Sequence, residues 1–70
     1  MERRQLEYFI AVVDNGGFSR AAEAQHVTQP SLSQAINALE KDLDVTLFHR
    51  LGRQVKLTSA GEALLAPARQ

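Results

Sequence analysis

The side chains best suited to chemistry in this sequence lie in two segments that lack acidic residues. The eight Asp and Glu residues leave residues 24–39 and 45–61 free of negative charge. The first segment is uncharged and rich in Gln, Ser, Thr and Asn, whereas the second holds Arg50, Arg53 and Lys56. Amide and hydroxyl groups match the hydrogen-bonding edges of DNA bases, and cations match phosphates. On charge alone, a DNA-reading surface and an ordinary solvated helix followed by a basic loop both remain open.

Length and composition argue against several classes of function. The chain has 70 residues, 44% of them hydrophobic, no cysteine and a formal net charge of zero. A domain of this size buries only about 60% of its unfolded surface, which argues against a deep catalytic cleft. No base–nucleophile–orienter arrangement is evident, and His26 and His49 have no clustered ligands at metal-binding spacing. We therefore expect a protein that is not an enzyme, with no cofactor or metal in this fragment.

The apolar segments give no sign of a membrane anchor. The longest, residues 8–13, is much shorter than the roughly 20 residues that span a bilayer. Arg3 and Arg4 precede no apolar stretch suited to export. The sequence predicts a small, soluble, cytoplasmic module with no membrane partner.

Hydrophobic spacing predicts two helices at the start of the chain. Apolar residues recur at intervals of three and four over residues 3–14, which is typical of an amphipathic helix. The Asn-Gly-Gly sequence that follows should end this helix, because glycine tolerates a left-handed cap. A short second helix is expected over residues 18–25, with Phe18 buried and with either Gly17 or Ser19 as its N-cap.

A third helix, starting after Thr28, carries the uncharged segment. The Thr28 hydroxyl can accept a first-turn N–H, and Pro30 falls where its missing donor matters little. At about 100° per residue, four apolar residues fall on one side and are expected in the core. They are Leu32, Ile36, Leu39 and Leu43. The opposite side holds Pro30, Ser33, Gln34, Asn37 and Lys41. The acidic residues at the far end, within 40–44, are expected to form a solvated surface.

After the third helix the pattern changes to short β-compatible runs. Residues 47–48 and 55–57 flank a turn signal at Gly52, which predicts a hairpin with Arg50 and Arg53 near its tip. Such a hairpin is marginal alone and must pack on the helices through its apolar side chains.

A fourth helix is predicted after the hairpin, capped either by Thr58 or by Ser59, whose spacing to Glu62 fits a capping box. The order of elements is then helix, short helix, polar-faced helix, hairpin and helix. This order describes a winged helix-turn-helix, mainly α-helical with one small β-hairpin. In this fold the recognition helix lies in the major groove of DNA, and the hairpin adds a basic wing.

Four short motifs occur in a specific order and spacing. They are FSRAA at 18–22, TQPSLS at 28–33, LFHR at 47–50 and LTSAG at 57–61. With these motifs, the sequence from Leu6 to Arg69 closely resembles the N-terminal domain of LysR-type transcriptional regulators.

The resemblance implies a bacterial regulator of which this chain is one part. Residues 1–58 would be the winged helix-turn-helix domain and residues 59–70 the start of a linker helix, with the effector-binding domain absent. Family members act as dimers or tetramers on interrupted palindromic operators, and a small-molecule effector acts through the missing domain. We therefore expect double-stranded DNA as the partner, action at the bacterial nucleoid, and a monomer or weak dimer for this fragment alone.

The resemblance also assigns a reading surface. Base readout falls on Thr28, Gln29, Pro30, Ser33, Gln34 and Asn37. Backbone or wing contacts are expected from Arg20, Ser31, Arg50 and Arg53. Gln29 and Gln34 can each pair bidentately with adenine. Gln34 and Asn37 stand where many family members carry Arg, so we expect weaker guanine readout from this face.

Three alternatives stay open. Arg50 can equally be a structural partner of an acidic residue in 40–44, and Arg20 can pair with Glu23 three residues on. At the level of function, the net neutrality keeps a protein–protein interaction module without DNA readout as the alternative to a DNA reader.

Overall fold

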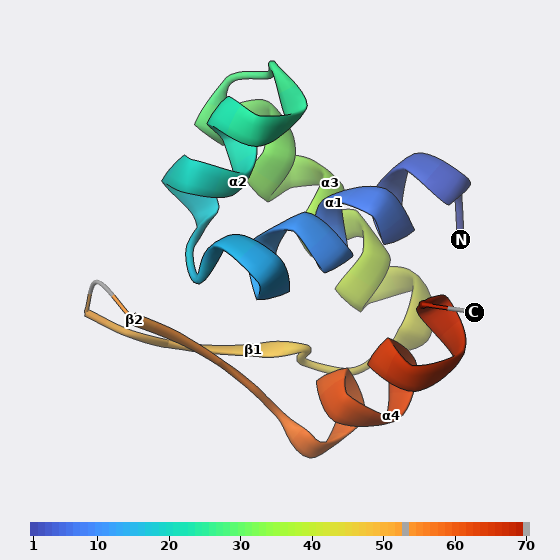
Figure 1. Cartoon of the computed structure of the whole chain (residues 1–70). Helices are drawn as coiled ribbons and strands as arrows, with labels where there is room; N and C mark the ends of the chain where they lie inside the picture. Colours follow the sequence, from blue (N-terminus) through green and yellow to red (C-terminus); the bar gives the residue numbers. More distant parts are fainter. Residues whose placement is uncertain (53, 70) are drawn as a thin grey trace.

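Residues 1–52 and 54–69, the part of the chain that the computed structural model describes, form four helices and a two-stranded hairpin (Figure 1). The elements are α1 (Arg3–Asn15), α2 (Phe18–Gln25), α3 (Gln29–Leu43), β1 (Phe48–Leu51), β2 (Gln54–Leu57) and α4 (Ser59–Ala68). This order confirms the predicted winged helix-turn-helix. Among these helices, none is both long enough and apolar enough to cross a membrane.

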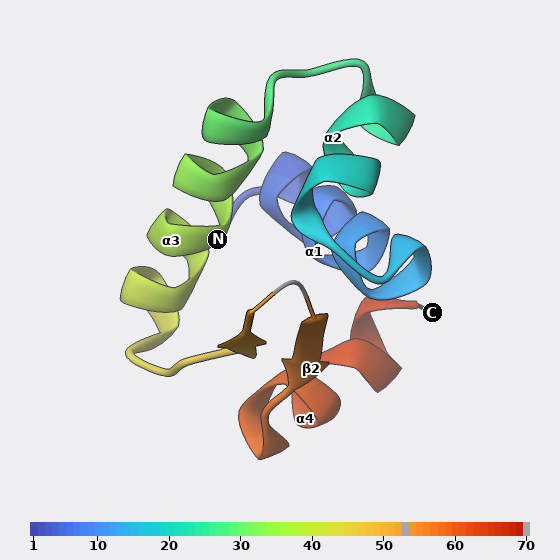
Figure 2. The ribbon, with the colours of Figure 1, turned by 90° about the vertical axis from the view of Figure 1, so that its left-hand side faces the viewer.

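The first three helices pack on one another, and the hairpin and α4 close the remaining side (Figure 1). α4 contacts both α1 and β2. In the view turned by 90°, α3 and α2 flank α1, and the hairpin and α4 lie below them (Figure 2). The core sits where these elements meet. Its largest fully buried side chains are Phe9, Val12, Leu32, Ile36, Leu39 and Leu47.

The turns between the helices follow the local signals in the sequence. α1 ends at Gly16, whose φ of 73° is left-handed, as glycine readily allows. Gly17 is the N-cap of α2, which settles the choice between Gly17 and Ser19. Thr28 caps α3, and its Oγ1 accepts the N–H of Ser31 at 3.3 Å.

The apolar stripe of α3 ends earlier than predicted. Leu32, Ile36 and Leu39 are fully buried, whereas Leu43 is 36% exposed. Placing Leu43 in the core was therefore wrong. It is the last residue of α3, and the chain leaves the helix directly after it through Asp44, which adopts a left-handed φ of 56°.

The hairpin is longer than predicted, and Arg50 belongs to its first strand. β1 and β2 pair antiparallel with Arg50 opposite Val55, and the ladder continues to Leu51 opposite Gln54. Arg50 therefore lies within β1, one residue before its end and near the tip of the hairpin, as predicted. Arg53, the other predicted wing residue, lies outside the described residues.

Thr58 joins the hairpin to α4. It is the N-cap of α4, so Ser59 is the first helical residue and not the cap. The Thr58 Oγ1 accepts the N–H of Gly61 at 3.0 Å and donates to the carbonyl oxygen of Thr46. The two bonds tie the start of α4 to the segment that leads into β1. Leu64 and Leu65 of α4 are half-buried against the core.

Glu40 is a structural residue, contrary to the expectation that the whole acidic end of α3 is a solvated surface. Its Oε2 accepts the N–H of buried Leu47 at 2.7 Å. Leu47 lies between α3 and β1, and among the described residues its N–H donates to no backbone carbonyl, so the carboxylate takes that role. Glu40 thereby fixes how the chain turns from α3 toward the hairpin.

Replacing Glu40 with alanine is expected to lower the free energy of unfolding by about 1–3 kcal/mol, because the Leu47 N–H loses its acceptor. Glu40→Gln keeps an acceptor oxygen and should recover much of this loss. The measurement is urea unfolding followed by circular dichroism. Equal stability of the alanine variant and the unaltered chain would show that this hydrogen bond contributes nothing.

Gly61 marks a close approach between α4 and the hairpin. A Cβ at this position would overlap the carbonyl oxygen of Leu47 and lie 2.7 Å from Leu57 Cδ2. In an open helical position, alanine would stabilise by up to about 1 kcal/mol. Here, Gly61→Ala is expected to destabilise by about 1–3 kcal/mol, as overpacking does.

Gly17→Ala is the matched control for this prediction, because no heavy atom lies within 4 Å of its added Cβ and its φ of 176° suits any residue. We expect it to change stability by only a few tenths of a kcal/mol to about 1 kcal/mol, through the cap alone. Thermal unfolding of both variants gives the comparison. A Gly61→Ala variant that melts higher than the unaltered chain would contradict the close contact.

Candidate nucleic-acid interface

The side of α3 opposite the core is open to solvent. The buried side consists of Leu32, Ile36 and Leu39. The exposed residues at and after its N-cap include Thr28, Gln29, Pro30, Ser31, Gln34 and Asn37, and Ser33 is half-buried. The helix therefore presents the uncharged hydrogen-bonding surface that its periodicity predicts. That these residues read bases stays a prediction.

Gln29 is oriented by a neighbour one helical turn away. Its Nε2 donates to the Oγ of Ser33 at 3.0 Å. A primary amide has two N–H donors and an acceptor oxygen, so this bond leaves one N–H and the oxygen for a base edge. Ser33 therefore orients the Gln29 amide.

The Thr28 hydroxyl is already engaged within the protein. It accepts the Ser31 N–H and donates to the Oγ of Ser31 at 2.8 Å. Of the Thr28 side chain, this leaves the methyl group as the part best suited to touch a base. The Ser31 hydroxyl keeps its own proton, which it can donate to a phosphate oxygen.

Arg50 reaches from the hairpin to both helices of the helix-turn-helix. Its Cζ lies 4.4 Å from the centroid of the Phe18 ring, and its Nη2 donates to Asn37 Oδ1 at 3.2 Å. Among the described residues it forms no ion pair with the acidic residues of 40–44. The sequence left open an acidic partner for Arg50. In the structure, Arg50 instead packs on the Phe18 ring and donates to the Asn37 amide.

Phe18 is a rigid support because it belongs to an aromatic cluster. Its ring meets that of Phe48 nearly edge-on, with centroids 5.7 Å apart and an interplanar angle of 73°. Phe48 also contacts Phe9, with centroids 5.3 Å apart. The position of Arg50 is thus linked to the core through buried rings.

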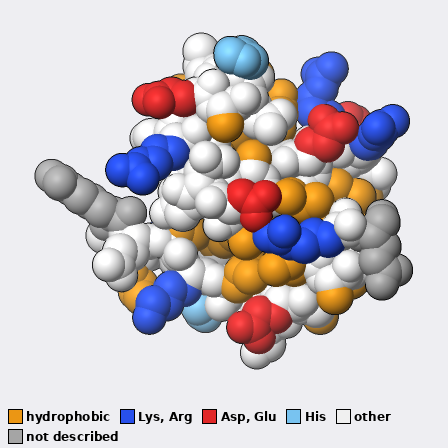
Figure 3. Space-filling model, in the orientation of Figure 1, with side chains coloured by type: hydrophobic (Ala, Val, Ile, Leu, Met, Phe, Trp, Pro, Cys, Tyr) orange, Lys and Arg blue, Asp and Glu red, His pale blue; other side chains and the backbone are white. Residues whose placement is uncertain are grey.

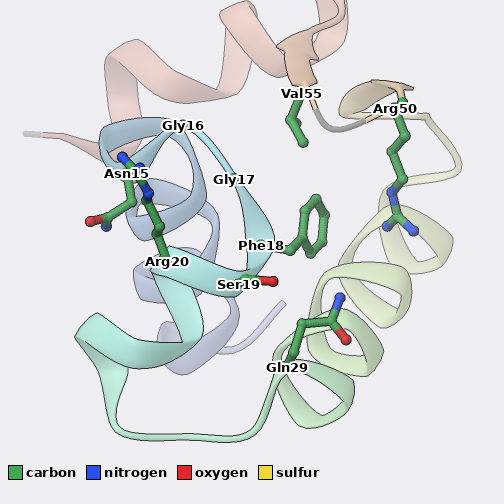
Figure 4. Close-up of a pocket in the computed structure, with 10 residues that line it drawn as sticks. Asn15, Gly16, Gly17, Phe18, Ser19, Arg20, Gln29, Arg50 and Val55 are labelled. Atoms are coloured by element: carbon green, nitrogen blue, oxygen red, sulfur yellow. The ribbon is translucent and has the colours of Figure 1, made fainter.

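A cleft of about 670 Å³ lies between the α1–α2 turn, the start of α3 and the hairpin. Figure 4 shows Arg20 and Arg50 on either side of Phe18, with Gln29 below them in the view. Two cations and one amide therefore border a single hollow. Such a hollow can accept the sugar–phosphate backbone of a nucleic acid.

Among the described residues, the charged side chains that line this cleft, Arg20 and Arg50, are both positive and exposed to solvent. Arg20 is exposed, and within the described part of the chain it forms no ion pair with Glu23. Figure 3 shows Lys and Arg side chains beside α2 and along the hairpin edge. In residues 1–52 and 54–69, no three His, Cys, Asp or Glu side chains gather as a metal site would require.

Sequence reasoning missed two features of this surface. The Gln29–Ser33 bond spans one helical turn, so its spacing alone could have indicated it. The packing of Arg50 on Phe18 joins a strand to a helix far apart in the chain. No local pattern signals that contact, because it depends on how the hairpin docks.

Comparison with protein families and sequences gives a consistent result. The profile of the bacterial regulatory helix-turn-helix proteins of the lysR family matches residues 3–62. The HTH-type transcriptional regulator TfdT of Cupriavidus pinatubonensis is 51% identical over 70 residues, which are 100% of this chain and 31% of TfdT. ClcR of Pseudomonas putida, also an HTH-type transcriptional regulator, is 50% identical over 70 residues, again 100% of this chain, and 24% of ClcR. The chain thus spans about a third or less of these two relatives.

Comparison with solved structures points the same way. The crystal structure of a CbnR_DBD–DNA complex superposes with a TM-score of 0.95 at 49% identity, covering 99% of this chain and 79% of that one. The BenM_DBD/benA site 1 DNA complex gives a TM-score of 0.94 at 40% identity, covering 99% and 80%. Both neighbours were crystallised with DNA.

Proposed function

Because this chain belongs to the LysR family of bacterial regulatory helix-turn-helix proteins, we propose that it is the domain with which a transcription regulator binds double-stranded DNA sequence-specifically. The observation that carries the proposal is the uncharged, exposed side of α3 opposite the buried Leu32, Ile36 and Leu39. Two structural neighbours with bound DNA support it.

In the proposed complex, α3 lies in the major groove and its side chains meet base edges. Gln29, held by Ser33, and Gln34 pair with adenine, since an amide offers the donor and acceptor that the adenine edge requires. Pro30 and the Thr28 methyl contact thymine methyl groups. Asn37, one turn further along α3, completes the reading surface.

Cations around the cleft hold the sugar–phosphate backbone in this proposal. Arg20 and Arg50 are cations that line the cleft. The neutral Ser31 hydroxyl adds a contact from the start of α3, and Arg53 of the wing lies in or beside the minor groove in this proposal. A narrow minor groove carries enhanced negative potential, which favours arginine. These contacts supply affinity for any DNA, whereas the uncharged side of α3 supplies the preference for one sequence.

The arrangement of the whole regulator is also a proposal. Residues 1–58 form the DNA-binding domain, and 59–70 begin a linker helix to an effector-binding domain. The full protein acts in the cytoplasm as a dimer or tetramer on an interrupted palindrome, and this chain alone is a monomer or weak dimer. Two recognition helices of a dimer then enter successive major grooves about 34 Å apart.

Selection of bound duplexes from a random pool, followed by titration at several salt concentrations, tests the proposed function. We expect a defined half-site, about 10³-fold or greater preference for it over random DNA, and affinity that falls steeply with salt. A module that contacts only proteins would show neither sequence preference nor salt-dependent DNA binding, and that outcome would overturn the proposal.

Arg53→Ala is expected to lower affinity for operator and random DNA alike, because a wing contact to phosphate carries little sequence information. The slope of log K against log salt is negative and should become less steep by about 0.9, which corresponds to the loss of one phosphate contact. Fluorescence anisotropy at several salt concentrations measures this slope. An unchanged slope would argue against a phosphate contact by the wing.

A further inference from the structure

We propose that Arg50 is a specificity-determining residue: it fixes the amide orientation of Asn37 and so makes Asn37 a hydrogen-bond donor toward DNA bases. This role rests on the proposed DNA-binding function and adds to it. Arg50 acts here through Asn37, and it is therefore a positioning residue for base readout.

The guanidinium of Arg50 occupies a defined place. Its Cζ lies over the Phe18 ring at 4.4 Å from the centroid, and Figure 4 shows the side chain reaching down from the hairpin past that ring toward α3. Phe18 is only 9% exposed and meets the buried Phe48 edge-on. The support beneath Arg50 is therefore part of the core and not a mobile surface side chain.

The direction of the hydrogen bond between Arg50 and Asn37 fixes which end of the Asn37 amide faces the hairpin. Arginine is always charged and has N–H donors but no acceptor. It bonds the Oδ1 of Asn37 at 3.2 Å. Turning the amide over would set its NH₂ group against the N–H groups of Arg50, with no hydrogen bond between them. Arg50 thus holds the Asn37 oxygen toward the hairpin and leaves the NH₂ group facing elsewhere.

The bond to Arg50 changes which bases the Asn37 amide can recognise. A free asparagine pairs bidentately with adenine, using its oxygen and its NH₂ group together. Arg50 already takes one of the two lone pairs of the Asn37 oxygen. Bidentate pairing would share this oxygen between Arg50 and adenine, whereas donation by the NH₂ group leaves the bond to Arg50 intact. Guanine N7 and O6, or thymine O4, present only acceptors to such a donor, whereas adenine places its own N6–H₂ donor beside its N7 acceptor. We therefore expect Asn37 to favour guanine or thymine over adenine.

Gln34 provides an internal comparison on the same surface. It is exposed, and among the described residues it has no hydrogen-bond partner for its amide. Its amide can therefore turn either way to suit a base. The Gln34 amide is thus free to turn, whereas the Asn37 amide is held in one orientation by Arg50. Both amides belong to the same uncharged side of α3.

Selection from a random duplex pool with the full chain and its variants tests this role. Asn37→Ala identifies the base position that Asn37 reads, because preference there disappears. The unaltered chain should disfavour adenine at that position by about tenfold. Arg50→Met should abolish this discrimination and leave the positions read by Gln29 and Gln34 unchanged. Arg50→Lys should keep it, since lysine is also a donor without an acceptor.

The outcomes separate the two proposals. If Arg50→Met weakens all duplexes equally and preserves discrimination at the Asn37 position, Arg50 is only a backbone contact and the inference is wrong. A preference for adenine at that position in the unaltered chain would also overturn it. If the unaltered chain selects no sequence at all, it is the proposed function that fails.

A measurement without DNA covers the case in which Arg50→Met binds too weakly for selection. In the NMR spectrum of the free chain, the side-chain NH₂ signals of Asn37 should differ from those of the free Gln34 amide. They should move to free-amide values in Arg50→Met and stay in place in Arg50→Lys. Signals of Asn37 that do not respond to Arg50→Met would show that the amide is not held, and the inference would fall.

Discussion

Replacing Phe48 with alanine is expected to destabilise the domain by about 3–5 kcal/mol, as large-to-small changes of a buried aromatic residue do. Phe48 is only 4% exposed, and its ring contacts Phe9 of α1 and Phe18 of α2. It is therefore the point where the hairpin is joined to the helices. A chain of 70 residues has a total stability of roughly 4–10 kcal/mol, so the loss is a large share of it.

Urea unfolding followed by far-ultraviolet circular dichroism measures this effect. Leu51→Ala is the matched control, because Leu51 lies in the same strand but is 59% exposed. We expect it to change stability by no more than about 0.5 kcal/mol. Similar midpoints for the Phe48 and Leu51 variants would show that the aromatic cluster does not hold the hairpin in place.

Replacing Gln34 with alanine is expected to weaken binding to the selected operator by about 5- to 100-fold and to leave binding to random DNA almost unchanged. A bidentate contact between an amide and a base contributes about 1–3 kcal/mol of discrimination. Gln34 is uncharged and exposed on α3, so its loss removes little attraction to phosphates and little packing. The effect should therefore fall on specificity rather than on affinity for DNA in general.

Competition binding with operator and scrambled duplexes at one salt concentration measures this ratio. Arg20→Ala is the contrasting variant, since a cation beside the cleft should contribute to both affinities alike. Equal losses on the two duplexes for Gln34→Ala would assign Gln34 to the backbone and not to the bases. Unfolding curves of the variant check that the difference does not come from the fold.

The features that were predictable from the sequence are those set by local rules. The two sides of α3 follow from the helical period, because residues three and four apart share a side. Thr28 as a cap, the left-handed Gly16 and the turn signal at Gly52 follow from the conformations these residue types favour. The exposed uncharged surface of α3 was therefore visible without coordinates.

The features that were not predictable depend on how distant elements meet. Arg50 follows Asn37 by 13 residues, and nothing between them indicates that the hairpin folds back along α3. The bond from the Leu47 N–H to Glu40 likewise depends on the path between α3 and β1. Leu43 was assigned to the core because periodicity describes a helix side but not where the neighbouring elements end.

Substitution of single purines by their 7-deaza analogues in the selected operator tests most directly whether α3 reads bases in the major groove. The change removes the N7 acceptor, which only the major groove exposes, and leaves base pairing and phosphates intact. We predict roughly fivefold or greater losses of affinity, about one hydrogen bond each, clustered in one major groove of each half-site. Unchanged affinity at every substituted purine would contradict base readout by the uncharged side of α3.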